Sequence, residues 1–328
     1  MKVYRGLDEL GRLEEGCTAT IGNFDGVHLG HQAILRRARQ LADAEGVHLV
    51  GVTFEPSPVR VLRPKEAPRR LTPLDVKMRL LEEHGLHRLL VLESTRELLG
   101  MTGEEFARDV LVGRLGVRHL VEGPTFHFGR QREATPKSLR QLGAELGFGV
   151  HLVEPQEVDL QEGTKVTVSS TLIRGQLMAG QVAAARRCLG RAYTLAGEVT
   201  PGRGAGKALG YPTANLRLLD AEQLAGRDGV YAGWARLGET LSEAWESNIR
   251  HRAAISIGGC ETFADGQWQI EAYLPEFAGG SLYGRQMLLS LVERVRDQER
   301  FEGVEVLQAA IAKDCRQVET ILLREETQ

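Results

Sequence analysis

Two histidines three positions apart follow an early apolar run of the chain. They are His28 and His31, and they belong to Gly22–His31, which reads GNFDGVHLGH and runs into a helical pattern. Glycines let a backbone come close to a ligand, and a helix N-terminus presents unpaired N–H groups and a positive dipole end to phosphate. Two imidazoles at this place can donate hydrogen bonds to phosphate oxygens. The alternative is a strand-to-helix turn capped by histidines.

A second group of polar residues lies at Val168–Arg174, which reads VSSTLIR. The hydroxyls of Ser169, Ser170 and Thr171 could donate hydrogen bonds to phosphate at the start of a helix. Arg174 could bind phosphate, because guanidinium groups bind phosphate with two parallel hydrogen bonds. Taken alone, this stretch is better interpreted as an ordinary helix cap.

A third candidate is a glycine-rich loop. Five glycines fall between Gly197 and Gly210, and the sequence YPTAN follows. Such a loop with Lys207 could fold over phosphates, but it lacks the P-loop spacing, and no βαβ unit surrounds it as a dinucleotide fingerprint would require. Thr213 and Asn215 offer side-chain oxygens, the kind of ligand that Mg²⁺ prefers. A Pro-Thr turn capping a strand is the alternative.

A glutamate further along could act as a base. The segment Trp268–Leu274 alternates between apolar and polar residues, which places Gln269, Glu271 and Tyr273 on the face that leaves the core. A carboxylate there could take the proton from a substrate hydroxyl. From the pattern alone, a solvated strand glutamate is the better interpretation.

The length of the chain, 328 residues, suits two domains, and its composition changes near residue 185. All three tryptophans lie beyond residue 190, whereas eight of the nine histidines lie before it. We therefore expect one domain over residues 1–184 and a second over residues 185–328.

Apolar strand-like runs alternate with helical patterns in the first of these domains. This alternation is typical of βαβ units and predicts an α/β domain with a parallel sheet, whose ligands collect at the carboxyl ends of the strands. The expected strands are 18–21, 48–54, 88–92, 119–121 and 149–153, and the expected helices are 31–45, 74–83, 102–115 and 136–146.

The second domain has a different pattern, in which short strand-like runs are separated by glycine turns. This pattern predicts a small antiparallel barrel closed by a C-terminal helix. A helical, basic segment over 170–191 is expected to connect the two domains. The expected strands are 193–199, 229–236, 253–257, 267–274 and 287–295, and the expected helix is 304–322.

Composition excludes several classes of protein. The formal net charge is −3, so no overall field favours nucleic acid or an anionic membrane. No apolar run approaches the roughly 18 residues that a membrane-spanning helix needs. The four cysteines are far apart with no CxxC pair, which argues against a zinc knuckle or a disulfide scaffold. We therefore expect a cytoplasmic enzyme that binds neither nucleic acid nor membrane.

The stretch GNFDGVHLGH resembles the HxGH motif of nucleotidylyltransferases, in the form found in the bacterial bifunctional riboflavin kinase and FAD synthetase family. The resemblance spans about residues 18–322 and implies a Rossmann-like N-terminal domain that joins FMN to AMP, giving FAD and pyrophosphate. It implies catalytic roles for His28, His31 and Arg174. The ATP-binding residues that it implies in this domain are Gly22, Phe24, Asp25, Gly26, Ser169, Ser170 and Thr171.

The C-terminal half resembles the riboflavin kinases of the same family, because YPTAN is similar to their PTAN motif. The resemblance implies ATP-dependent phosphorylation of riboflavin to FMN, with Glu271 as general base and Mg²⁺ on Thr213 and Asn215. It implies that Gly206, Lys207, Gly210, Thr213 and Asn215 bind ATP. The flavin-binding residues that it implies are Phe126, Phe128, Arg296 and Phe301, although alternating aromatics such as the first two are at least as often core residues.

The chain departs from the family pattern at several positions. Two lie in the first domain, Ser57 in place of a usual histidine and Thr125 in place of Asp or Asn. Two alternatives therefore stay open, a riboflavin kinase with a weakened or inactive adenylyltransferase domain and a non-catalytic flavin-binding protein. In each case the expected partners are riboflavin, FMN and ATP, and the chain is expected to be a monomer or a transient homo-oligomer. The departures in the second domain are Pro201, Ser256, Glu261 and Tyr273.

Overall fold

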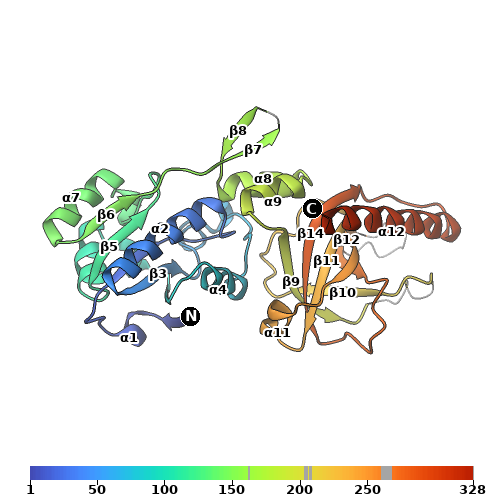
Figure 1. Ribbon diagram of the computed structural model, residues 1–328, viewed down its shortest axis with the longest axis horizontal. Coiled ribbons are helices and arrows are strands. Elements are labelled where there is room, and N and C mark those ends of the chain that lie inside the picture. Colours follow the sequence, from blue (N-terminus) through green and yellow to red (C-terminus); the bar gives the residue numbers. More distant parts are fainter. Residues whose placement is uncertain (162, 203–205, 207–208, 260–267, 328) are drawn as a thin grey trace. The chain divides into compact units, whose positions relative to one another are not determined.

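The computed structural model describes residues 1–161, 163–202, 206, 209–259 and 268–327. By its internal contacts the chain divides into two units, Met1–Ser169 and Ser170–Gln328 (Figure 1). The change of composition placed the seam near residue 185, whereas the contacts place the division after Ser169. The helix α9 (Val182–Leu189) packs on two strands of the second unit, which is why the connecting segment groups with that unit.

The first unit is built on a six-stranded sheet in the order β1-β4-β3-β2-β5-β6, and every pair in it is parallel. The expected parallel α/β architecture is confirmed. All five residues of β2 are buried, as in sheets that are covered on both faces. The strands are β1 (Lys2–Arg5), β2 (Cys17–Ile21), β3 (His48–Phe54), β4 (Arg88–Leu92), β5 (Val117–Glu122) and β6 (Gly149–Leu152).

Helices connect these strands. The longest, α2 (Leu29–Glu45), packs on β2, β3 and β5 and ends at Gly46, which adopts the left-handed conformation that glycine tolerates best. The predicted bounds of the helices 74–83 and 136–146 agree with the structure. The remaining helical segments are α1 (Leu7–Leu10), α3 (Pro58–Leu62), η1 (Pro64–Glu66), α4 (Leu74–Glu83), α5 (Arg96–Gly100), α6 (Gly103–Glu105), η2 (Phe106–Val112), η3 (Arg130–Arg132) and α7 (Pro136–Leu146).

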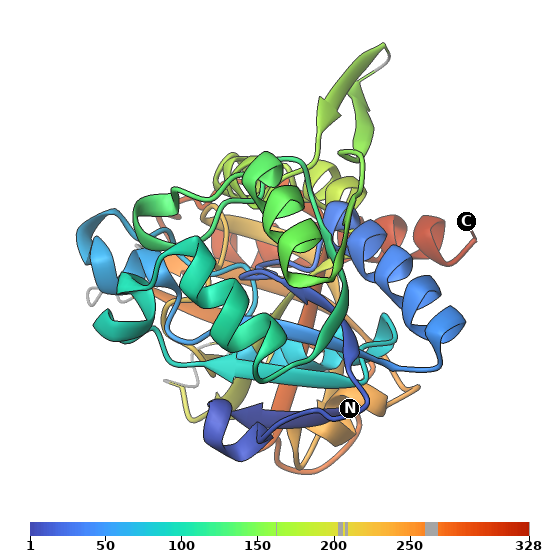
Figure 2. The ribbon, with the colours of Figure 1, turned by 90° about the vertical axis from the view of Figure 1, so that its left-hand side faces the viewer.

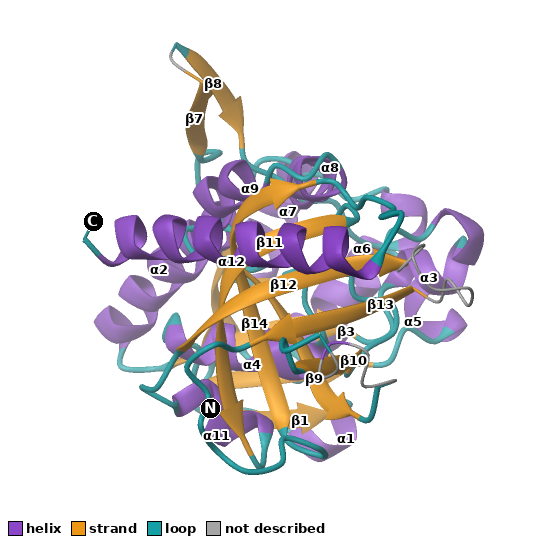
Figure 3. Cartoon of the chain, turned by 90° about the vertical axis from the view of Figure 1, so that its right-hand side faces the viewer, coloured by secondary structure: helices purple, strands orange, loops and turns teal. Residues whose placement is uncertain are grey.

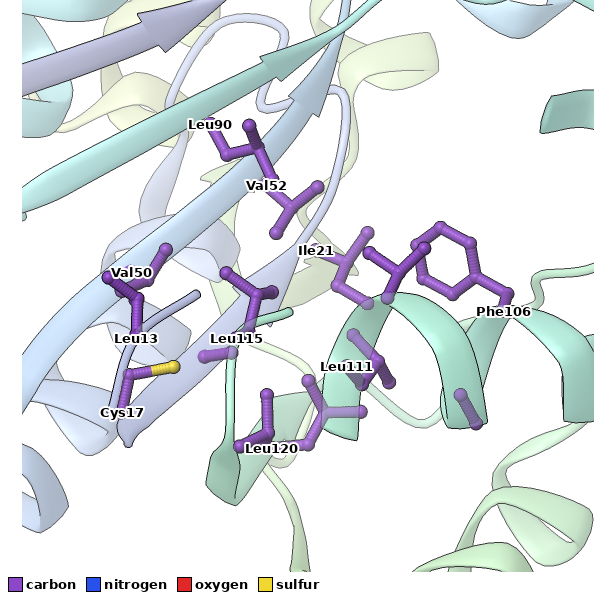
Figure 4. Close-up of a cluster of buried hydrophobic side chains, with 14 of the residues drawn as sticks. Leu13, Cys17, Ile21, Val50, Val52, Leu90, Phe106, Leu111, Leu115 and Leu120 are labelled. Carbon is purple, nitrogen blue, oxygen red and sulfur yellow. The ribbon is translucent and has the colours of Figure 1, made fainter. Parts of the chain in front are cut away.

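One face of the sheet forms an apolar core with the π-helical segment η2. Figure 4 shows Ile21 of β2 and Val52 of β3 on the side of Phe106 and Leu111 of η2. These four side chains are at most 6% exposed. Because Ile21 is the last residue of its strand, this core extends to the edge of the sheet at which the site loops begin.

A hairpin that the sequence analysis did not predict precedes the second unit. It consists of β7 (Glu157–Gln161) and β8 (Thr164–Thr167), and it projects away from the six-stranded sheet (Figure 2). Its sequence is polar and short, so the apolar alternation that reveals a buried strand is weak there.

The second unit begins with α8 (Ser170–Met178) and α9 and contains a closed barrel in the order β10-β13-β12-β11-β14-β9 (Figure 3). All its strand pairs are antiparallel, which confirms the predicted barrel. The short helix α11 (Leu241–Glu246) was not predicted. The strands are β9 (Tyr193–Thr200), β10 (Thr213–Leu218), β11 (Gly229–Gly238), β12 (His251–Gly259), β13 (Trp268–Tyr273) and β14 (Gln286–Arg296).

The predicted terminal helix is present as α12 (Val304–Glu326), which lies along the outside of the barrel (Figure 3). It packs on β11, β12 and β14, and Leu322 joins Trp234 in a small apolar cluster. A buried ion pair fixes it further, because Arg296 at the end of β14 donates to both carboxylate oxygens of Asp314, at 3.0 and 2.8 Å. In the described part of the chain, no helix combines the length and apolar character needed to cross a membrane.

Candidate functional site

The loop after β2 has an unusual backbone. Phe24 and Val27 have positive φ angles, 46° and 39°, which side chains of this size rarely adopt. Both are fully buried, at 1% and 0% exposure, so packing of their side chains fixes the conformation. The ring of Phe24 meets His31 edge-on at 5.5 Å between ring centroids. Phe24 therefore shapes the loop from inside it.

Asp25 has its carboxylate turned towards a neighbouring loop. Its Oδ1 accepts hydrogen bonds from the backbone N–H groups of Leu71 and Thr72, at 2.9 and 3.0 Å. The Thr72 hydroxyl in turn accepts from the N–H of Gly26 at 3.1 Å. Lys77, 6% exposed, lies near this carboxylate, and burial lowers its pKa while Asp25 opposes that shift. Asp25 thus joins the loop after β2 to residues 71–72.

The two histidines of the HxGH motif stack on each other at the start of α2. Their ring centroids are 3.7 Å apart with an angle of 19° between the planes. His28 occupies the N-cap position of α2, and its ring is almost completely buried. A Cβ atom at Gly30 would lie 3.1 Å from Cε1 of His28. The glycine of the motif is therefore the residue that leaves room for the stack.

The stretch that begins at Ser169 falls at the junction of the two units. Ser169 is the last residue of the first unit, and Ser170 begins α8 in the second. Ile173 is buried, whereas Thr171 is exposed and Arg174 half-buried. Ser170 and Arg174 are four positions apart, so they share one face of α8.

A cavity of about 610 Å³ lies within the first unit, at the carboxyl edge of its sheet. Its wall includes Gly22 after β2, Val59 of α3 and Leu98 of α5. The rings of Phe126 and Phe128 also line it and stack on each other, with centroids 5.4 Å apart. The two phenylalanines also pack on the core cluster, as the interpretation of them as core residues requires, and their contact with flavin stays a prediction.

The departures in the first unit lie close to this cavity. Thr125 lines it directly, and its carbonyl oxygen lies 2.8 Å from Nδ1 of His127. Ser57 is the N-cap of α3, whose residues Pro58 and Val59 line the same cavity. Both departures therefore lie at or next to the cavity, and neither is a residue of the stacked pair.

The second site is assembled on paired strands of the barrel. Asn215 of β10 is opposite Glu271 of β13, and Thr213 is opposite Tyr273 in the same ladder. Side chains directly opposite each other on one face are roughly 5 Å apart at Cβ. Ala214 and Ala272 are buried while these four are half-buried, so the predicted departure of Glu271 from the core is confirmed.

Glycines cover this pair of strands closely. A Cβ atom at Gly202 would lie 1.9 Å from the side-chain nitrogen of Asn215, and one at Gly206 would lie 3.2 Å from the hydroxyl oxygen of Thr213. Gly210 has a φ of 85°, a conformation that favours glycine. Lys207 of the same loop, and Glu261, lie outside the described residues.

Two aromatic contacts border the second site. The rings of Tyr211 and Tyr273 meet edge-on at 5.3 Å, and burial raises the pKa of Tyr273. Arg296 is bound to Asp314, and its guanidinium lies 5.4 Å from the centre of the Phe301 ring. Arg296, which with Phe301 is a predicted flavin contact in this unit, is thus held in place by Asp314 of α12.

Comparison with known proteins matches both halves of the chain. The FAD synthetase family model matches residues 11–172, and the riboflavin kinase model matches residues 189–322. The bifunctional riboflavin kinase/FMN adenylyltransferase of Pseudomonas fluorescens is 36% identical, and that of Escherichia coli K12 is 34% identical. Each alignment covers 96% of this chain and 96% of the relative. The chain belongs to this family.

The presence of both family domains supports the bifunctional interpretation over a kinase alone or a flavin carrier. A solved structure is also similar over nearly the whole chain. It is a crystal structure of a macrolide-efflux protein from Streptococcus pneumoniae, with a TM-score of 0.82 and 25% identity. It covers 97% of this chain and 99% of that one.

Sequence reasoning missed two features of these sites. The strand β10, which carries Thr213 and Asn215, is not among the expected strands, although Ala214 and Leu216 alternate with polar residues in the way a strand requires. Glu122 was also overlooked. It is 2% exposed at the end of β5, and a carboxylate that ends an apolar run at the carboxyl edge of a sheet was the available signal.

Proposed function

We propose that the first unit transfers an adenylyl group from ATP to FMN at the loop Gly22–His31. In this reaction an FMN phosphate oxygen attacks the α-phosphorus of ATP, the bond to the β-phosphate oxygen breaks, and FAD and pyrophosphate form. No protein nucleophile is needed, so positioning and neutralisation of charge supply the catalysis. The relatives' shared name and the FAD synthetase match support this assignment.

In this proposal His28 and His31 bind the phosphates. Their stack at the N-terminus of α2 orients two N–H groups beside the positive end of a helix dipole, which favours charge on the α-phosphate in the transition state. Gly22 and Gly26 let the loop backbone approach the nucleotide. Asp25 acts indirectly, because its carboxylate is bound to residues 71–72. Phe24 also acts indirectly, because its ring is buried.

Ser169, Ser170, Thr171 and Arg174 are proposed to bind ATP, as the family resemblance implies, with Arg174 holding the pyrophosphate that leaves. The isoalloxazine ring of FMN occupies the cavity of about 610 Å³, against Phe126 and Phe128. A volume in this range is usual for small-molecule sites, and stacked aromatic rings suit a flat, conjugated ligand.

For the second unit we propose that Glu271 is the general base of riboflavin phosphorylation. The carboxylate takes the proton from the ribityl 5′-hydroxyl, the oxygen attacks the γ-phosphorus of ATP, and ADP leaves. Phe301 contacts the flavin ring, and Arg296, held by Asp314, positions Phe301. Gly206, Lys207 and Gly210 belong to the loop that covers ATP.

The residues present fit a divalent metal. Thr213 and Asn215 offer oxygen atoms on one face of β10, and Mg²⁺ prefers oxygen ligands shared with phosphates. When bound, the metal would neutralise charge on the ATP phosphates. Because ATP is the co-substrate of both reactions, we place the enzyme in the cytoplasm.

The observation that carries the proposal is the cross-strand placement of Glu271 beside Asn215 in one unit and the stacked histidines in the other. The test is incubation of the full chain with riboflavin, ATP and Mg²⁺, with products separated by chromatography. We expect FMN and then FAD. Accumulation of FMN without FAD would exclude adenylyl transfer, and no conversion at all would leave only flavin binding.

A further inference from the structure

The strands β2 and β5 meet where the order of the sheet reverses. From β2 the chain continues through β3 and β4 on one side, and then returns to β5 and β6 on the other. Ligands of open parallel sheets bind in the crevice at such a switch point. The two loops that leave this point are residues 22–28 and 123–129, and both contribute to the cavity of the first unit.

The two strands separate before they end. The ladder between β2 and β3 continues to Ile21 opposite Val52, and the N–H of Gly22 still donates to the Val52 carbonyl at 2.9 Å. The ladder between β2 and β5 stops earlier, at Ala19 opposite Leu120. On this side the N–H of Ile21 therefore has no strand carbonyl opposite it.

A side chain replaces the missing carbonyl. Oε1 of Glu122, the last residue of β5, accepts a hydrogen bond from the N–H of Ile21 at 2.6 Å. An apolar residue in place of Glu122 would leave this buried N–H without an acceptor, which is unfavourable because the donor has already lost its contact with water. The carboxyl group thus ties the residue before one loop to the residue before the other.

The surroundings of Glu122 are apolar. Its side chain is 2% exposed, and among the described residues no arginine, lysine or histidine forms an ion pair with it. Burial raises its pKa well above the ordinary range, and the hydrogen bond from Ile21 opposes this only in part. A neutral carboxyl group offers a carbonyl acceptor and one O–H donor, and a glutamine amide of nearly equal size keeps the acceptor and has two N–H donors.

We propose that Glu122 is a positioning residue for adenylyl transfer, whose carboxyl group bridges the gap between β2 and β5 and holds the two site loops in register. This inference rests on the proposed location of the adenylyl-transfer site. If the bridge is lost, residues 21–23 and 125–128 move apart and the cavity between them widens. FMN then binds less tightly, and its phosphate is displaced from the stacked histidines.

The test compares Glu122→Leu with Glu122→Gln in the full chain. Leucine removes the acceptor, and we expect kcat/KM for conversion of supplied FMN to FAD to fall about 10- to 100-fold, as displacement by about 1 Å can produce. The KM for FMN should rise several-fold, which a smaller folded fraction cannot cause. Glutamine keeps the acceptor and should lose less than about threefold.

Two controls accompany these variants. Thr18→Val changes a buried side chain of β2, the strand next to that of Glu122. The Thr18 hydroxyl has no partner among the described residues, so this variant should leave FAD synthesis unchanged. The rate of riboflavin phosphorylation, measured in the same samples, reports on the second unit and should not change in any variant.

A Glu122→Leu variant that is folded by circular dichroism and keeps the FMN KM and FAD synthesis of the parent would overturn the role of Glu122. If the leucine variant does not fold, Glu122→Asp tests the same hydrogen bond, because its shorter side chain cannot reach Ile21. Equal activity of the aspartate and glutamine variants would then contradict the proposal. His31→Ala distinguishes a failure of the Glu122 inference from a failure of the proposed site. Full FAD synthesis in that variant would show that the adenylyl-transfer site lies elsewhere.

Discussion

The two units handle phosphate groups on different kinds of support. In the first, the candidate groups lie on a loop between a parallel strand and a helix, and buried side chains hold that loop in an uncommon conformation. In the second, Thr213, Asn215 and Glu271 project from hydrogen-bonded strands, where the register alone sets their spacing. A loop site needs supporting residues of its own, whereas a strand site is supported by the barrel.

The glycines illustrate the same difference. Gly30 in the first unit makes room for two side chains to stack, so it acts on the shape of the proposed catalytic pair, His28 and His31. Gly202 in the second unit lies against the side chain of Asn215, so it acts on the loop that covers an already ordered strand. Substitutions at Gly30 and at Gly202 can therefore test the comparison, because the first changes the histidine stack and the second changes the loop beside Asn215.

The largest effect is expected for Glu271→Ala. Loss of a general base should lower the rate of riboflavin phosphorylation by about 10²–10⁴-fold, while conversion of supplied FMN to FAD stays at the parent level. Both rates are measured by chromatography on the same preparation. If a folded variant lost both activities, the assignment of one reaction to each unit would be wrong.

His31→Ala should give the reverse pattern. Removing one phosphate-binding imidazole is expected to slow FAD formation by about 10²–10³-fold and to spare FMN formation. Equal slowing of the two reactions would contradict the separation of the sites.

Gly30→Ala tests the stack without removing either histidine. The added methyl group would lie 3.1 Å from the His28 ring, so the ring must shift, and we expect FAD synthesis to fall about tenfold. Gly100→Ala is the matched control, because its added methyl group meets nothing within 4 Å. Unchanged FAD synthesis in Gly30→Ala would show that the exact stacking geometry is not needed.

Gly202→Ala is the corresponding change in the second unit. Its methyl group would collide with the Asn215 amide, but the loop can shift while β10 stays in the barrel. We therefore expect a smaller loss of riboflavin phosphorylation, about two- to fivefold, visible mainly as a higher KM for ATP. Gly280→Ala, with open space around it, is the control. A loss greater than that of Gly30→Ala in its own reaction would reverse the comparison.

The smallest effect concerns stability and pH. The raised pKa of Glu122 means that its contribution to folding is fully present below about pH 4.5 and is lost as the pH rises towards the folded-state pKa. Glutamine does not titrate, so the melting temperature of Glu122→Gln relative to the parent should increase between pH 5 and pH 8. For Thr18→Val, the difference in melting temperature from the parent should not depend on pH. If the difference for Glu122→Gln were also independent of pH, Glu122 would be ionised in the folded protein.

Several elements could be predicted from the sequence because their signals are local. The helices 74–83 and 136–146 have clear apolar periodicity, and the strand 48–54 is a β-rich run bounded as observed. The strand β10 was missed because a proline directly precedes it, its first three residues belong to the PTAN-like motif, and only two buried residues alternate within it. The hydrogen bonds from residues 71–72 to Asp25 could not be predicted, since nothing local in the sequence indicates them.

The sequence by itself determined the chemistry that is available, since residue type and short-range spacing decide that two imidazoles flank a glycine and that a glutamate leaves the core. Only the tertiary structure decided which of these groups meet. Asn215 lies beside Glu271 because two distant segments pair in one register, and Glu122 bridges to Ile21 because the sheet order reverses between their strands. Strand pairing joins residues far apart in the chain, and its register depends on the packing of the whole core and on no single segment.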